Sequence, residues 1–575
     1  MRIAKTYLCL LTATSVLAPP VIARPSPSPA QPRVTIKNGT LVGAQNSEYH
    51  QDYFLGIPYA LPPVGNLRFN MPHELNESWS TERAATAYGP FCRTAPLKLP
   101  GFSQDGVTYA RSEDCLTLNI VRPSGLSSCS KVPVLVWIHG GGLQDGGSGD
   151  PRYNMTFLVK ESVSMGAPII GVSINYRISG WGFLNGAVVN ASRVANLGLH
   201  DQRLALHWIH ENIGAFGGDP TRITIHGESS GAISVGHHLL AYGGRDDRLF
   251  HAAIAQSGGP LSPSSFLTLD QQDEQYAQVL NATKCSGLED TLGCLRSVSA
   301  DVLDDAFRPL TFTPVIDGGL VPDFPSASLK EGKFVKVPLL IGANTNEGTP
   351  FTTWGGLGVD NKAEFMAAIK AFDAGQGLSD KVASDITEYY VTRLTQNDLK
   401  QQLGTVLVSP GPSYGALYGP ISLYLGDVLF SSGRRYSLQA WHEHDVPAYS
   451  YRFDSVPSGI SSKVLGAAHF QEVAFVFNNL AGEGYNVNPL SSSSIQREGQ
   501  LQHLSMLMAR MWLSFATTLS PNHHEVPNFN ITWPKYQNDN PTNMVFRLEN
   551  TTLEADNFRL DGTTQIIQAF KELKL

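Results

Sequence analysis

The amino-acid sequence predicts an α/β fold in which helices flank a large, mostly parallel central sheet. Short apolar runs rich in β-branched residues are followed by glycine-rich turns and then by segments with helical spacing of apolar residues, an alternation typical of strands connected through helices. Most runs are apolar throughout, as expected for strands covered by helices on both faces. The 575-residue chain shows no shift in composition, which favours one large domain.

Six segments are the candidate core strands of this sheet: 133–138, 168–174, 222–226, 252–256, 337–342 and 448–453. Between the second and the third, residues 201–213 place Leu204, Trp208 and Ile209 on one helical face, which predicts a crossover helix. Residues 262–312 and 352–430 lack this rhythm but have helical character. We expect them to be helical insertions beside the sheet that help to shape a substrate pocket.

The N-terminus has the features of a secretory signal peptide. Arg2 and Lys5 precede an apolar run that ends at Ala18, and we place cleavage after Ala23, since Pro19 would follow a cut after Ala18. Residues 24–33 are rich in Pro and Ser and should form an extended leader, which leaves residues 34–575 as the domain. No later apolar run is long enough to span a bilayer.

Composition and histidine spacing argue against nucleic-acid, cofactor and metal partners. Loss of the signal peptide takes the net charge from −8 to −10, and the sequence contains no basic cluster. We therefore expect no nucleic-acid partner. No cofactor or metal is expected either, because three groups of neighbouring histidines lack convincing further ligands: His237 with His238, His442 with His444, and His523 with His524.

Cysteines and glycosylation sequons support export. Five cysteines remain after the signal peptide, and short separations favour pairing Cys92 with Cys115 and Cys285 with Cys294, which leaves Cys129 outside both bonds. The sequence also contains Asn-x-Ser/Thr sequons, which acquire N-glycans only on the secretory route. There are seven of them, at Asn38, Asn76, Asn154, Asn190, Asn281, Asn530 and Asn550.

A Gly-x-Ser-x-Gly turn is the sharpest local signal for chemistry. Ser229 lies between Gly227 and Gly231, after an apolar strand and before the helical segment 232–240. Such a nucleophile elbow forces the serine into a strained conformation and needs small neighbours. An ordinary glycine-rich turn is the alternative, and the flanking strand and helix favour the elbow.

A second glycine run follows the strand at 133–138. Gly140, Gly141 and Gly142 expose backbone N–H groups, and such donors can stabilise the alkoxide that develops when an ester carbonyl is attacked. A flexible turn is the alternative here. The position after a strand and upstream of the elbow favours an oxyanion hole.

Further motifs surround these two turns. Residues 216–220 (FGGDP) and 227–231 (GESSG) together resemble the signature of type-B carboxylesterases and lipases, the family that includes acetylcholinesterase. Residues 113–119 (EDCLTLN) match a second signature, and residues 196–202 (NLGLHDQ) are also similar to the family. The resemblance runs from about Val34 to the C-terminus, and the most similar subgroup is that of secreted fungal carboxylesterases and lipases.

The resemblance implies an α/β-hydrolase fold with a catalytic triad in the order serine, acid, histidine. It places the acid at Glu347 and the base at His469, with Ser229 as nucleophile. Spacing alone could not select His469 from 16 histidines. The oxyanion donors implied are the backbones of Gly141, Gly142 and Ser230, where the family usually has alanine at the last position.

Four other acidic or basic residues have expected roles. Glu228 directly precedes the nucleophile and would add negative potential, and Glu472 is a candidate for the same polar network, although either can be structural. Arg68 and Glu113 match a family ion pair that ties the N-terminal region to the first disulfide loop.

The same resemblance bears on the substrate, a small-molecule or lipid-like ester. Residues 93–114 contain no Trp to hold choline, and residues 261–265 contain no Trp to narrow the acyl pocket. We therefore expect medium or bulky acyl groups. The first disulfide loop is short for a lipase lid, so we expect little interfacial activation. The alternatives are an interfacially activated lipase, an acyltransferase of secondary metabolism, and a non-catalytic adhesion protein.

Overall fold

A computed structural model describes residues 31–94, 98–102, 104, 106–261, 266–354, 356, 358–372 and 378–573. The expected signal peptide and residues 24–30 of the leader lie outside the described residues. So do residues 262–265, where the cholinesterase acyl-pocket Trp was sought. The first strand begins at Arg33, one residue before the expected start of the domain.

The central sheet has eleven strands in the order β16-β15-β14-β13-β12-β11-β9-β10-β8-β4-β3. All neighbours from β10 to β15 are parallel, and antiparallel strands extend the sheet at both edges. Its strands are β3 (Ala44–Asn46), β4 (Gln51–Pro58), β8 (Thr117–Pro123), β9 (Val132–Ile138), β10 (Ile170–Ile174), β11 (Gly218–Glu228), β12 (Ala252–Gln256), β13 (Leu339–Asn344), β14 (Ala448–Phe453), β15 (Thr542–Phe546) and β16 (Thr552–Ala555). The α/β class and mostly parallel sheet are as predicted.

All six expected core strands are present, as β9 to β14. The edge strands were not predicted, nor were two small sheets in the N-terminal region. These sheets contain β1 (Arg33–Ile36), β2 (Gly39–Val42) and β5 (Arg83–Ala84), and β6 (Phe91–Cys92) with β7 (Arg111–Ser112).

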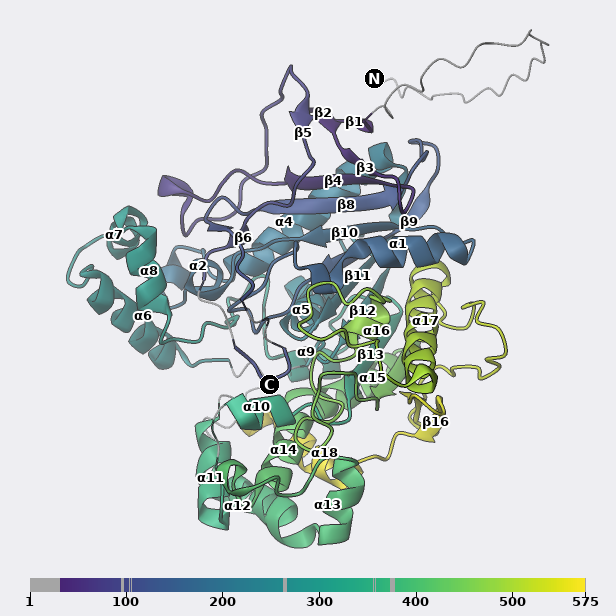
Figure 1. Cartoon of the computed structure of the whole chain (residues 1–575). Coiled ribbons are helices and arrows are strands. Elements are labelled where there is room, and N and C mark those ends of the chain that lie inside the picture. The colour runs from purple at the N-terminus through teal and green to yellow at the C-terminus, as the bar shows by residue number, and fades with distance from the viewer. Residues whose placement is uncertain are drawn as a thin grey trace.

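Helices cover both faces of the central sheet, as Figure 1 shows. Among them, α4 is the expected crossover helix and α5 is the helix that follows the nucleophile elbow. The bounds are α1 (Met155–Ser164), α2 (Ser179–Phe183), α3 (Ala187–Ala191), α4 (Leu197–Asn212), α5 (Ser230–Gly244), α6 (Leu269–Thr283), α7 (Thr291–Ser297), α8 (Ala300–Phe307), α9 (Pro325–Lys330), α10 (Thr349–Trp354), α11 (Lys362–Ala371), α12 (Asp380–Thr387), α13 (Gln396–Leu403), α14 (Tyr418–Gly426), α15 (Ser432–Glu443), α16 (Val473–Val476), α17 (Ile495–Thr518), α18 (Leu560–Gln568) and α19 (Phe570–Leu573).

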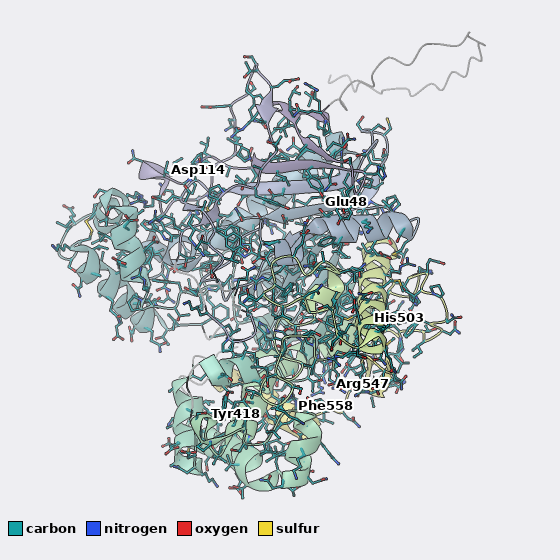
Figure 2. The ribbon with its side chains drawn as sticks, viewed as in Figure 1. Glu48, Asp114, Tyr418, His503, Arg547 and Phe558 are labelled. Atoms are coloured by element: carbon teal, nitrogen blue, oxygen red, sulfur yellow. A yellow bond between two sulfur atoms is a disulfide. The ribbon has the colours of Figure 1, made fainter. Side chains whose placement is uncertain are left out.

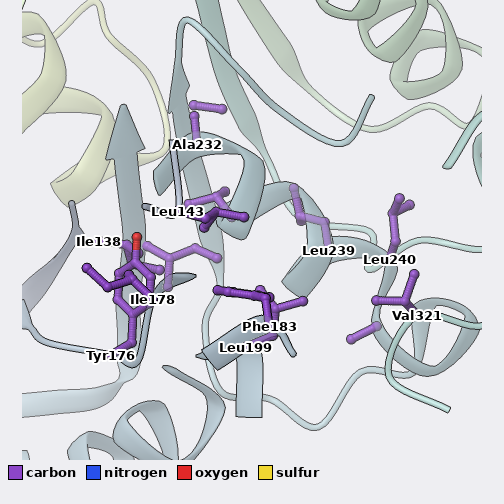
Figure 3. Close-up of a cluster of buried hydrophobic side chains, with 14 of the residues drawn as sticks. Ile138, Leu143, Tyr176, Ile178, Phe183, Leu199, Ala232, Leu239, Leu240 and Val321 are labelled. Carbon is purple, nitrogen blue, oxygen red and sulfur yellow. The ribbon is translucent and has the colours of Figure 1, made fainter. Parts of the chain in front are cut away.

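The side chains of β9 alternate between two hydrophobic cores. Val136 and Ile138 belong to the core that includes residues of α4, α5 and α15, whereas Leu135 and Trp137 belong to the core that includes residues of α1 and α17. Figure 3 shows the first core around α5, where Leu239 lies among buried side chains from several segments. This packing fixes the position of α5, and therefore of the elbow at its N-terminus.

The two segments expected to be insertions are helical. In Figure 1, α6, α7 and α8 form a lobe at one side of the molecule, and α11, α12 and α13 form another at its lower end. In the described part of the chain, no helix combines the length and apolarity that a membrane crossing requires.

Two disulfides and one ion pair organise the N-terminal half. Cys92 bonds to Cys115 and Cys285 bonds to Cys294, as predicted, while Cys129 is exposed and belongs to neither bond. The expected pair is also present, with Arg68 Nε 2.7 Å from a carboxylate oxygen of Glu113. Arg68 additionally donates to three backbone carbonyls between residues 295 and 298. It thereby joins the regions of both disulfides.

Candidate active site

Ser229 lies at the sharp turn between β11 and α5, in a conformation that L-residues seldom adopt. Its φ is 55° and its ψ is −127°. A Cβ on Gly227 would lie 2.3 Å from the carbonyl carbon of Gly231, and a Cβ on Gly231 would lie 2.0 Å from the oxygen of Ile138. The turn therefore requires glycine at both flanking positions, as the sequence motif indicates.

His469 lies between Ser229 and Glu347 and contacts both. Its Nε2 is 2.8 Å from Ser229 Oγ, and its Nδ1 is 2.7 Å from Glu347 Oε2. The two loops meet because Asn346 and Ala468 form a short parallel bridge just beyond β13. With Nδ1–H donating to the carboxylate, Nε2 is left as the acceptor that faces the serine hydroxyl. The structure thus brings together three residues that are far apart in the sequence.

The carboxylate of Glu347 is fully buried and held by donors on both oxygens. Ser257 Oγ and the backbone N–H of Asn344 each donate to Oε1 at 2.6 Å, while Oε2 faces His469. These bonds fix the orientation of the acid. Sequence reasoning did not single out Ser257, although its place directly after β12 put it at the same edge of the sheet as the elbow.

The residues proposed for the oxyanion hole line the same turn region. Gly141 and Gly142 follow β9 in a loop with φ values of 107° and 65°, and Ser230 is the first residue of α5. A Cβ on Gly140 would lie 2.7 Å from the oxygen of Glu228, so the glycine loop approaches the elbow closely. Backbone N–H groups at the start of a helix favour negative charge.

We expect Ser230→Ala to leave kcat/KM within about threefold of the wild-type value, because the proposed oxyanion donor at this position is the backbone N–H. The Ser230 hydroxyl is buried and has no hydrogen-bond partner among the described residues. Its removal should therefore raise the free energy of unfolding by about 1 kcal/mol. Steady-state kinetics and thermal unfolding would check both values, and a hundredfold loss of activity would show that the hydroxyl itself acts in the reaction.

Two further buried acids lie beside the triad. Glu472 accepts hydrogen bonds from Gln256 Nε2 at 2.9 Å and Asn344 Nδ2 at 2.6 Å. Glu228 has neither oxygen hydrogen-bonded among the described residues, and its Oε1 is 3.4 Å from His469 Nε2. Burial, followed by the charges of Glu472 and Glu347, raises the pKa of Glu228 well above its usual range. This direction favours the neutral acid, whereas the sequence led us to expect that Glu228 adds negative potential.

Aromatic rings that the sequence did not indicate cover the imidazole of His469. Phe430 stacks on it with ring centroids 4.7 Å apart, and Phe351 lies 5.2 Å away in a tilted arrangement. Phe430, the last residue of the expected insertion at 352–430, lies between α14 and α15, whereas Phe351 of α10 lies just before that insertion. The insertion therefore contributes Phe430 to the site. Across the residues that the structure describes, there is no group of three or more His, Cys, Asp or Glu that could hold a metal ion.

Comparison with known proteins identifies the family of the chain. Residues 30–562 match the model of the carboxylesterase family. Lipase 2 of Geotrichum candidum is 32% identical, over 91% of this chain and 93% of that protein. Secreted lipase 1 of Botryotinia fuckeliana is 33% identical, over 88% of each chain.

A solved structure extends the similarity to the whole fold. The crystal structure of Aspergillus niger EstA superposes with a TM-score of 0.79 and 28% sequence identity, and the match covers 95% of this chain and 99% of that chain. The chain therefore belongs to the carboxylesterase family and is a carboxylic ester hydrolase with the α/β-hydrolase fold.

Proposed function

We propose that Ser229, His469 and Glu347 form the catalytic triad, and that the backbone N–H groups of Gly141, Gly142 and Ser230 form the oxyanion hole. The observation that carries the proposal is the unbroken chain of contacts from Ser229 Oγ through His469 to Glu347, at 2.8 and 2.7 Å. The strained conformation of Ser229 supports it, because such strain is typical of a nucleophile elbow.

The reaction begins when Ser229 Oγ attacks the ester carbonyl carbon while His469 Nε2 accepts the hydroxyl proton. The oxyanion accepts hydrogen bonds from the three backbone donors. Glu347 holds the imidazole in the required tautomer and stabilises the imidazolium. When the tetrahedral intermediate collapses, the imidazolium gives its proton to the departing alcohol, and Ser229 is left acylated.

Hydrolysis of the acyl-enzyme repeats these steps with water as the nucleophile. His469 takes a proton from the water, and the second intermediate collapses to release the carboxylic acid and return the proton to Ser229 Oγ. Purified chain incubated with a library of esters tests the proposed function. A folded chain that hydrolyses no ester in the library would contradict it.

We also propose that the enzyme is secreted, with a signal peptide at residues 1–23, a leader at residues 24–33 and one hydrolase domain at residues 34–575. The two disulfides support this, since such bonds persist in oxidising compartments. The relative from Botryotinia fuckeliana is named as secreted. N-terminal sequencing of protein recovered from the medium would test the cleavage after Ala23.

Among acyl groups, we expect kcat/KM to rise from acetyl to butyryl and longer esters. Residues 261–265 contain no Trp that would narrow the acyl pocket, and each buried methylene contributes about 0.8 kcal/mol, or about fourfold. Hydrolysis of p-nitrophenyl esters of increasing acyl length measures this directly. A sharp preference for acetyl over butyryl would contradict a wide acyl pocket.

A lipase is the second candidate, because the relative from Geotrichum candidum bears that name. The first disulfide loop nevertheless has fixed contacts beside the site. The carbonyl of Gly101 accepts a hydrogen bond from Gln471 Nε2 at 2.8 Å, and the ring of Phe102 packs against that of Phe470 at 4.4 Å. These contacts hold the first disulfide loop against the segment that carries His469.

We therefore expect an esterase with little interfacial activation. The rate should follow simple saturation as a short-chain triacylglycerol passes its solubility limit. Emulsified substrate measured across that limit provides the test, and a steep increase in rate at the limit would support the lipase.

A further inference from the structure

The seven sequons differ in how their asparagine side chains are placed. Asn38 is buried, and its Nδ2 donates to the carbonyls of Leu75 and Glu77 at 2.7 and 2.8 Å. Nδ2 of Asn154 and of Asn190 also donates to another side chain. Four asparagines are exposed, namely Asn76, Asn281, Asn530 and Asn550. Only these four present an Nδ2 that no described residue engages.

Two of the exposed asparagines line one surface groove. The groove has a volume of about 290 Å³, and Asn530 and Asn550 both contribute to its wall although they lie in different segments. Figure 2 labels His503 of α17 and Arg547, which follows β15; both residues also line this groove. We name it the α17 groove.

The α17 groove combines apolar and polar side chains. Its floor contains Leu504 and Leu507, which are buried, and its walls contain Phe529, Ile531 and Leu548, which are partly buried against the same core. Polar side chains, among them His503, Arg547 and Glu549, complete the lining, so the groove suits an occupant that has both apolar and polar surface. The two sequon asparagines in the wall of the groove, Asn530 and Asn550, indicate which occupant this is.

Polar contacts fix the two segments that carry the sequons. Asn522 accepts a hydrogen bond from the backbone N–H of Trp533 at 2.7 Å and donates to the carbonyl of the same residue at 2.9 Å, which fixes the segment that carries Asn530. Arg547 pairs with Asp454 at 2.8 Å beside the segment that carries Asn550. The shape therefore exists before any occupant arrives.

We propose that N-glycans on Asn530 and Asn550 occupy the α17 groove, with their first sugars packed against Phe529 and Leu548. A pyranose ring has an apolar face of C–H groups, which suits an aromatic ring, and polar edges, which suit His503 and Arg547 at the rim. The inference rests on the proposed secretion, because N-glycans are added only on that route.

The modification is a substitution at the sugar's anomeric carbon. Nδ2 of each asparagine loses a proton and forms a bond to C1 of a sugar carried on a lipid-linked diphosphate. The bond from C1 to the diphosphate oxygen breaks, and its electron pair leaves with the diphosphate. Glycosylation covers the apolar side chains of the groove and adds hydroxyl groups toward solvent.

The test uses full-length chain secreted from a glycosylating eukaryotic host, with peptide mass mapping of all seven sequons. We expect glycans on Asn530 and Asn550. Hydroxyl-radical footprinting of Phe529 should then give several-fold more labelling in the Asn530→Gln/Asn550→Gln variant than in wild type. Asn281→Gln removes a sequon outside the groove and should leave the labelling of Phe529 unchanged.

The possible results of this experiment distinguish the proposed glycan site from the proposed secretion. Unmodified Asn530 and Asn550 beside a modified Asn281 would overturn the site and leave secretion intact. A chain that is not exported and has no glycans would overturn both, without bearing on ester hydrolysis. Glycans on both residues with equal labelling of Phe529 in wild type and double variant would overturn their packing in the groove.

Discussion

Ser229→Ala should lower kcat by about 10⁶-fold while leaving the fold intact, because the proposed nucleophile is removed and the triad acts as a unit. Alanine keeps the Cβ that the strained backbone already accommodates at φ 55°. Steady-state hydrolysis of an activated ester, with thermal unfolding as the measure of folding, gives the result.

A comparison of single and double variants provides a control, because the effects on kcat of residues that act as a unit are not additive. His469→Ala alone should cost about as much as Ser229→Ala, and the double variant should lose little more. A Ser229→Ala enzyme that is folded and retains more than about one tenth of wild-type kcat would contradict the assignment of the nucleophile.

Glu347→Gln should lower kcat by about 10⁴-fold, as removal of the acid's charge does in triads of this kind. The reason lies in the hydrogen bonds to the acid. Ser257 and the backbone N–H of Asn344 both donate to Oε1, so the oxygen of glutamine must occupy that place. Its NH₂ group then faces Nδ1 of His469 and forces the proton onto Nε2. In that tautomer the imidazole cannot accept the proton of Ser229.

Glu113→Gln is the matched control for loss of a partly buried carboxylate, since Glu113 pairs with Arg68 rather than with a triad residue. It should leave kcat nearly unchanged. Kinetics and unfolding of both variants would be compared under one set of conditions. Equal loss of kcat in the two variants would show that Glu347 acts through stability and not through His469.

Much of the fold follows from local sequence patterns. The runs that became β9 to β14 are apolar. Glycine is required at 227 and 231 because a Cβ there would lie only 2.3 and 2.0 Å from neighbouring backbone atoms. In β8, by contrast, the buried polar residues Asn119 and Arg122 interrupt the apolar pattern. Arg122 pairs with Asp52 of β4, so each charge is satisfied by a strand that lies far away in the sequence. Local patterns do not predict such partners.

The residues of the candidate site also divide into those that local sequence patterns predict and those that they do not. Ser229 and the glycine loop are marked by their own neighbours in the sequence, whereas His469 was selected only through resemblance to a family. Ser257 and Phe430 carry no motif. The sheet order brings Ser257 to the carboxylate of Glu347, and a helical insertion brings Phe430 to the imidazole of His469. The raised pKa of Glu228, which burial causes, is likewise a product of the folded environment.

Labelling with a fluorophosphonate probe tests most directly whether Ser229 is an activated nucleophile. Peptide mapping of the folded wild-type chain should place the phosphonyl adduct on Ser229, and the labelling rate should fall steeply in Glu347→Gln. Denatured chain should not react. Folded wild-type chain with no adduct on Ser229, or with the adduct on another serine, would contradict the proposed mechanism.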